Sequence, residues 1–105
     1  MAYIRKHLRE GLKVLGNTYS IKRIDFEDCL YKDLGNGIDF EISHCREGYC
    51  IFVWMYKPYL KMIRSVPQDS YMSSILLSEL KGTLDKLENE FMHFEEVLKK
   101  YNKLF

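Results

Sequence analysis

Three cysteines, one of them next to a histidine, are the residues of this chain whose types could support nucleophilic or metal chemistry. His44 and Cys45 are adjacent, and Cys50 follows after a short polar stretch. A zinc site needs four nitrogen or sulfur ligands, usually as two close pairs, and the second pair is missing unless Cys29 approaches the first. Adjacent residues of a strand point to opposite faces, so His44 is badly placed to activate Cys45 as a nucleophile. We therefore expect no catalytic residue, no metal and no cofactor, and a protein that is not an enzyme.

Carboxylates around Cys29 are the other candidates for a metal site. Several acids at a strand end and turn can hold Mg²⁺, as in metal-dependent nucleases. No paired motif of that kind stands out in the spacing. We interpret the stretch as a solvated acidic surface, formed by Asp25, Glu27, Asp28 and Asp33.

Basic residues near the start of the chain are a candidate nucleic-acid contact. In a helical conformation they would share the outer face, and they are Arg5, Lys6, Arg9 and Lys13. The chain has 16 Lys and Arg against 15 Asp and Glu, a net charge of +1. This balance argues against a strongly acidic DNA mimic and against a chain built mainly to neutralise phosphate. Nucleic-acid binding or regulation through this helix is therefore the alternative function.

Aromatic residues gather in the segment YCIFVWMY and just after it. The segment is apolar on both faces of the expected strand, so each face needs a cover. The C-terminal helix supplies one cover, and the first helix or a partner must supply the other. An exposed aromatic patch flanked by cations would be a protein-binding hot spot. We expect this patch to comprise Arg46, Trp54, Tyr56, Lys57 and Tyr59.

The elements that must position these residues follow the order helix, strands, helix. Apolar residues at helical spacing, followed by Gly16 and Asn17, predict a helix within residues 1–17. Alternating segments separated by Gly-rich, polar and Pro-containing turns predict three to four antiparallel strands within residues 18–66. We expect an α+β fold in a single domain over residues 1–105. The alternation in TYSIKRIDFE slips between Ile21 and Ile24, which indicates either a bulge or a strand end.

The C-terminal third carries a long apolar seam. Large apolar residues recur at alternating steps of 3 and 4 from Leu77 to the end of the chain. Pro67, Gln68 and Asp69 are typical of a helix start, and a helix over residues 69–105 would be about 55 Å long. Such a helix overshoots its own domain, so either it breaks near Gly82 or another surface covers it. We expect the second half of the seam to form a homodimer contact through Phe91, Phe94, Leu98, Tyr101 and Phe105.

Compartment and membrane association follow from weaker indications. The cysteines are odd in number and form no CxxC pair, and no basic segment followed by an apolar core opens the chain. The longest apolar run is much shorter than a membrane span. We therefore expect a cytoplasmic protein that does not associate with membranes.

A pattern over residues 36–91 resembles small accessory proteins of phages and mobile elements of Gram-positive bacteria. The segments that carry the resemblance are NGIDFEIS, GYCIFVWMYKPYLKMIRSVP and LLSELKGTLDKLENEF. The basic first helix and the long C-terminal extension depart from that pattern. Where such proteins have a known role, they often bind and block host defences, as anti-CRISPR proteins do. The resemblance implies a stoichiometric inhibitor of a host defence nuclease, acting in the host cytoplasm, and it transfers no site residues.

Overall fold

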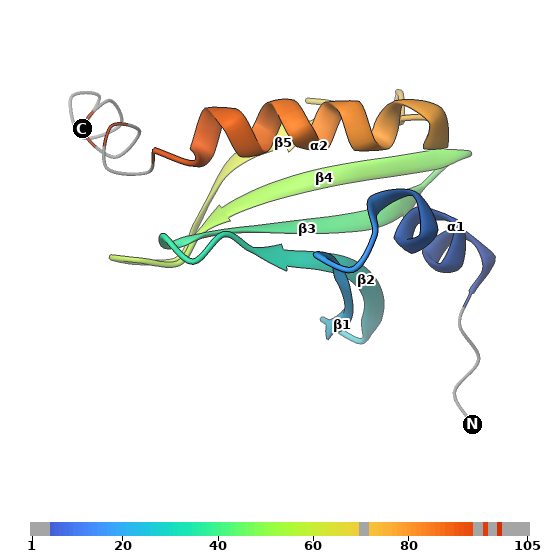
Figure 1. Ribbon diagram of the computed structural model, residues 1–105, viewed down its shortest axis with the longest axis horizontal. Helices are drawn as coiled ribbons and strands as arrows, with labels where there is room; N and C mark the ends of the chain where they lie inside the picture. The colour runs from blue at the N-terminus through green and yellow to red at the C-terminus, as the bar shows by residue number, and fades with distance from the viewer. Residues whose placement is uncertain (1–4, 70–71, 94–95, 97–98, 100–105) are drawn as a thin grey trace.

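The computed structural model describes residues 5–69, 72–93, 96 and 99, and it has an α+β fold (Figure 1). The elements are α1 (Lys6–Leu15), β1 (Ser20–Ile24), β2 (Glu27–Asp33), β3 (Ile38–Cys45), β4 (Gly48–Met55), β5 (Lys61–Val66) and α2 (Leu77–Phe91). The strands form one antiparallel sheet in the order β1-β2-β3-β4-β5. The fold class and the order of elements are confirmed. The strand number is corrected to five, and the C-terminal helix to 15 residues.

The additional strand arises because the slip in TYSIKRIDFE is a strand end and not a bulge, and a hairpin turn follows it. β1 ends at Ile24, and β2 begins at Glu27 directly opposite it. Between them Asp25 and Phe26 have φ values of 51° and 67°, so both central turn residues are left-handed. This is the geometry that matches the twist of a tight hairpin, usually with Asn-Gly or Asp-Gly at these positions. Phe rarely occupies such a turn, so the sequence pattern did not predict the hairpin.

α1 forms within the segment expected for it and is tied to the sheet. The helix ends at Leu15, directly before the glycine that was expected to end it. Gly16 has a φ of 85° and donates its N–H to the Leu12 carbonyl at 2.8 Å. The Tyr49 hydroxyl on β4 donates a hydrogen bond of 2.6 Å to the His7 carbonyl. Leu8 and Leu15 are buried. α1 is thus hydrogen-bonded to β4 and packed into the core.

α2 begins at Leu77 and not at residue 69, because β4 holds the residues before it in an extended conformation. Ile75 and Tyr49 exchange two backbone hydrogen bonds of 2.8 Å each, as residues of paired strands do. Gly48 permits this approach, since a Cβ at that position would collide with the Ile75 carbonyl oxygen. The Glu79 side chain then accepts a hydrogen bond of 3.4 Å from the Leu76 N–H and places an acid in the first helical turn.

The end of α2 is also set by a distant residue. The Asn36 side chain donates a hydrogen bond of 2.9 Å to the Phe91 carbonyl, and its amide oxygen accepts one of 3.2 Å from the Ile38 N–H. α2 is continuous through Gly82, so the break considered there does not occur. The expected helix over residues 69–105 is therefore wrong in its extent, and only two residues beyond the Met92–His93 bend, 96 and 99, are described.

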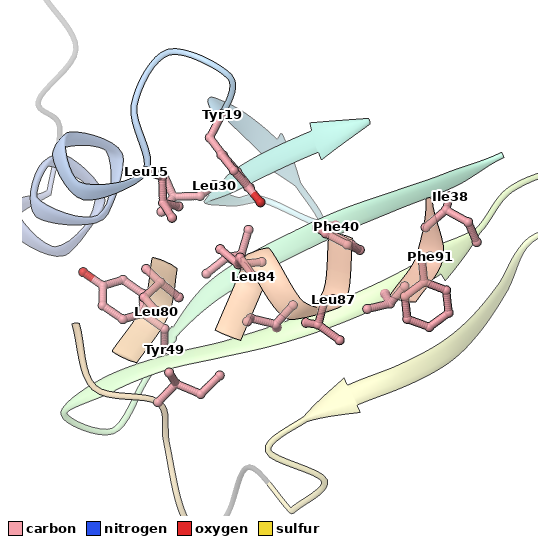
Figure 2. Close-up of a cluster of buried hydrophobic side chains, with 14 of the residues drawn as sticks. Leu15, Tyr19, Leu30, Ile38, Phe40, Tyr49, Leu80, Leu84, Leu87 and Phe91 are labelled. Carbon is pink, nitrogen blue, oxygen red and sulfur yellow. The ribbon is translucent and has the colours of Figure 1, made fainter. Parts of the chain in front are cut away.

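The core lies between one face of the sheet and the two helices (Figure 2). α2 contributes Leu80, Leu84, Leu87 and Phe91, which face Ile38, Phe40 and Ile42 of β3 and Ile51 and Val53 of β4. Full burial of such a side chain stabilises the fold by about 1.5–3 kcal/mol relative to its exposure. The first half of the seam is thus core. Phe91 is only 1% exposed, so it is not available for the expected homodimer contact. Phe94, Leu98, Tyr101 and Phe105 lie outside the described residues.

Candidate protein-binding face

Both helices pack on the same face of the sheet, so neither of the described helices lies over the opposite face. We call this second surface the open face. Strand register places alternate side chains on it, and it is defined by Lys22, Cys29, Tyr31, Asp39, Glu41, Cys50, Phe52, Trp54 and Met62. Of the two covers that the apolar β4 strand was expected to need, the described part of the chain supplies one, on the side of the helices.

Aromatic and apolar residues of β4 and the turn after it form one end of the open face. Phe52 and Trp54 are half-buried among their neighbours. After the turn at Lys57 and Pro58, the chain exposes Tyr59 by 50%, Leu60 by 72% and Met62 by 45%. Met62 lies directly opposite Trp54. Four of the five residues expected in the aromatic patch therefore lie near one another, as their closeness in the sequence requires: Trp54, Tyr56, Lys57 and Tyr59.

Arg46 is not part of this group. It occupies the turn between β3 and β4 with a φ of 55°, at the far end of β4 from Lys57. The rise of an extended strand puts roughly 30 Å between these two positions. A partner that contacts Arg46 and Tyr59 together would have to span the length of the sheet.

Acidic residues on the open face were missed as part of the site. Asp39 lies directly opposite Trp54, and Glu41 lies opposite Phe52. The Tyr31 hydroxyl donates a hydrogen bond of 2.7 Å to Asp39, and the Trp54 indole lies close enough to Glu41 to favour its charged form. The alternation of Asp39 and Glu41 with apolar residues was visible in the sequence. That they share a face with Trp54 depends on the register between β3 and β4.

A groove of about 420 Å³ runs across the open face between β1 and the residue that precedes β5. Its lining combines apolar, acidic and basic groups: Lys22, Arg23, Ile24, Asp25, Tyr31, Asp39, Glu41, Trp54 and Leu60. Lys22 Nζ lies 4.2 Å from the centre of the Tyr31 ring, within cation–π distance. The groove therefore already holds one cation of its own chain beside an aromatic ring and a carboxylate.

Asp39 and Glu41, two of the carboxylates of the groove, are partly withdrawn from water. Burial raises the pKa of Asp39 above its ordinary value of 3.8, although the hydrogen bond from Tyr31 opposes the shift. Burial likewise raises the pKa of Glu41 above 4.5, against the hydrogen bond from Trp54. Charged carboxylates in such surroundings gain more from a bound cation than carboxylates in open water.

The thiols lie on the open face, while His44 faces the helices. Burial raises the pKa of Cys29 to about 11 and that of Cys50 to about 12, and the Cys45 thiol contributes to the second shift through a hydrogen bond. Both groups are therefore protonated near neutral pH, which makes them weak nucleophiles. The His44 ring stacks on His7 with the ring centres 4.1 Å apart, so it lies on the other side of the sheet from Cys45.

The basic residues of the first helix lie on its exposed side. Lys6, Arg9 and Lys13 are exposed on α1, and Arg5 is exposed just before the helix begins. Lys6 forms an ion pair of 3.8 Å with Glu10, which neutralises part of the group. These residues lie on α1 or directly before it and not on the open face, so the two candidate binding surfaces are separate.

Within residues 5–69 and 72–93 and at 96 and 99, no group of three or more His, Cys, Asp or Glu side chains is arranged to hold a metal ion. Within the same ranges, no helix is both long enough and apolar enough to cross a membrane.

Comparisons with protein-family models, with curated proteins and with solved structures found no match to this chain.

Proposed function

We propose that this chain is a non-catalytic protein-binding module that captures its partner on the open face. The observation that carries the proposal is the set of large apolar residues exposed at one end of a sheet face that neither described helix covers. Tyr59, Leu60 and Met62 are all at least 45% exposed, next to the half-buried Trp54. Aromatic anchors surrounded by polar groups are typical of the energetic centre of protein interfaces.

The role that we propose for this module is stoichiometric inhibition of a host defence nuclease. The resemblance to phage-encoded accessory proteins supports this role and the host cytoplasm as its place of action. An inhibitor of this kind acts by occupying a surface, so it needs a stable binding face and no reacting group. A nuclease titrated with the protein should lose activity linearly and reach zero near one inhibitor per active complex.

The experiment that tests the proposal combines this titration with variants of the open face. Purified CRISPR effector nucleases from Gram-positive bacteria are titrated with the wild-type protein and with Trp54→Ala, Tyr59→Ala and Lys57→Glu. We expect truncation of an aromatic anchor to weaken inhibition by about 30-fold, which corresponds to about 2 kcal/mol. Glu47→Gln, in the turn at the far end of β4, is the matched control and should inhibit like the wild type. Folded open-face variants that inhibit fully would contradict the proposed surface.

Nucleic-acid binding through α1 is the second candidate, favoured by the exposed cations Arg5, Lys6, Arg9 and Lys13. Binding of this kind weakens steeply with salt, with a slope set by the number of phosphates contacted. A fluorescent DNA or RNA duplex titrated at increasing salt, with Arg9→Glu and Lys13→Glu as variants, distinguishes it. Salt-dependent binding that these variants abolish would support this candidate over the first.

A further inference from the structure

We propose that the groove on the open face receives an arginine side chain presented by the protein partner. The inference rests on the proposed protein-binding function and specifies the chemistry of the partner. It places the guanidinium at Asp39 and Glu41 and the aliphatic part of the side chain along the apolar lining of the groove.

The charges that line the groove favour a cationic occupant. Three carboxylates line it, Asp25, Asp39 and Glu41, against two cations, Lys22 and Arg23. Arg23 forms an ion pair of 3.7 Å with Asp28, which is not part of the lining. Lys22 lies over the ring of Tyr31, whose hydroxyl donates a hydrogen bond to Asp39. Glu41 lies beside the Trp54 indole in the groove, and its carboxylate oxygens have capacity to accept hydrogen bonds from a ligand.

The apolar and aromatic lining favours arginine over a compact cation. Ile24, Trp54 and Leu60 border the same groove as the carboxylates. A planar guanidinium can stack on an indole ring, and its forked donors can reach carboxylate oxygens in the same plane. The methylene groups of the side chain can then lie along the aliphatic residues while the charged end reaches the acids.

The arrangement of Lys22 shows that this surface can accommodate a cation next to aromatic rings. Its amino group is 4.2 Å from the Tyr31 ring centre, on a strand that pairs with β2. A partner's arginine would take the neighbouring position, beside Glu41 and Trp54. Nucleases line their nucleic-acid channels with arginine and lysine. An inhibitor with this groove therefore fits a basic channel surface as its target.

The test uses the full chain and a short peptide, acetyl-Gly-Arg-Gly-amide. The chain has a single tryptophan, so indole fluorescence and the indole N–H signal in NMR spectra both report on the groove alone. We expect a saturable shift of both signals with a dissociation constant on the order of 1 mM, as a single side chain allows. The same peptide with citrulline, which is neutral and nearly isosteric, should produce no saturable shift. Equal shifts with both peptides, or none with arginine at about 20 mM, would overturn the proposal.

Variants separate the carboxylate contact from general peptide adsorption. Glu41→Gln should weaken arginine binding about tenfold, as the loss of one charged hydrogen-bond acceptor predicts. Lys22→Met removes the resident cation and should strengthen binding, and it serves if the Glu41 variant does not fold. Glu47→Gln is the matched control and should bind like the wild type. A Glu41 or Lys22 variant that folds and binds arginine unchanged would overturn the assignment of the groove.

Failure of this inference can be told apart from failure of the proposed function. If the peptide does not bind but Trp54→Ala still abolishes nuclease inhibition, the open face is an interface for a partner of other chemistry. If the peptide binds as expected but open-face variants inhibit normally, the groove is real and the proposed surface of inhibition is wrong.

Discussion

At the scale of single residues, His7 joins α1 to the sheet. Its ring stacks on His44 and lies 6.4 Å, centre to centre, from the Tyr49 ring, while its carbonyl accepts the Tyr49 hydroxyl. Burial and the charges of His44 and Arg5 lower the pKa of His7 below 6.5, and Glu27 opposes this shift. The folded protein therefore binds this proton less readily than the unfolded chain does. Stability due to His7 is present above pH 6.5 and is lost as the pH falls through the folded pKa.

We predict that His7→Gln reduces the loss of stability between pH 7.5 and pH 5. The measurement is the free energy of unfolding in urea at several pH values for the wild type and the variant. His93→Gln, which alters an exposed histidine outside this stack, is the control and should keep the wild-type slope. If the free energy of unfolding of the folded His7 variant fell with pH as steeply as that of the wild type, the stack would not resist protonation.

Glu88 is a second residue that joins distant segments. Its Oε1 accepts hydrogen bonds from the Tyr19 hydroxyl at 2.9 Å and from Lys32 Nζ at 2.6 Å. Tyr19 is buried, and burial raises its pKa, with further contributions from the hydrogen bond to Glu88 and the charge of Glu88. We predict that Glu88→Ala lowers the free energy of unfolding by about 1.5–3 kcal/mol, because a buried hydroxyl loses its charged acceptor.

The control for Glu88 is the exposed pair of Lys81 and Asp85 on the same helix, whose charged atoms are 3.1 Å apart. Surface pairs one helical turn apart contribute only about 0.3–0.5 kcal/mol. Asp85→Ala should therefore change stability much less than Glu88→Ala in the same urea titration. Equal effects would show that the junction with Tyr19 and Lys32 adds nothing to a solvated ion pair.

At the scale of elements, two glycines predict opposite outcomes for the same substitution. Gly48 lets the segment before α2 pair with β4, and a Cβ there would strike the Ile75 carbonyl. Gly82 lies within α2 with nothing near its Cβ position. We predict that Gly48→Ala destabilises the protein by about 1–3 kcal/mol and that Gly82→Ala stabilises it by about 0.5–1 kcal/mol.

Thermal unfolding measures both glycine variants on one scale, since 1 kcal/mol corresponds to a change in Tm of about 4–8 °C in a domain of this size. Each variant is the control for the other, because both add a single methyl group. A stabilised Gly48→Ala protein would contradict the close approach of Ile75 to β4. A destabilised Gly82→Ala protein would contradict a continuous α2.

At the scale of the whole molecule, the predicted homodimer contact now depends on four of the five residues expected for it. Phe91 belongs to the core, so the proposed contact rests on Phe94, Leu98, Tyr101 and Phe105, outside the described residues. We predict that light scattering after size-exclusion chromatography gives twice the 12.6 kDa chain mass. A chain that ends at His93 keeps the contact between Asn36 and Phe91 and should be a folded monomer. A monomeric full-length protein would contradict this prediction.

Much of the fold was predictable because it depends on local patterns. Helical spacing and Gly16 located α1, and the alternation in Ile38, Phe40 and Ile42 identified the buried face of β3. The turns at residues 34–37, 46–47 and 57–60 contain the glycine, proline and polar residues that predicted them. The hairpin at Asp25 and Phe26 was missed because its left-handed geometry is adopted by a residue that rarely marks it.

The sequence by itself determined the order of elements, the buried faces and most turns, because periodicity and the backbone limits of glycine and proline act within a few residues. Only the tertiary structure decided where α2 begins and ends, through Tyr49 bonding to Ile75 and Asn36 bonding to Phe91. It also decided that Asp39 and Glu41 share the open face with Trp54. These outcomes depend on strand register and on contacts between residues far apart in the chain, which no local pattern specifies.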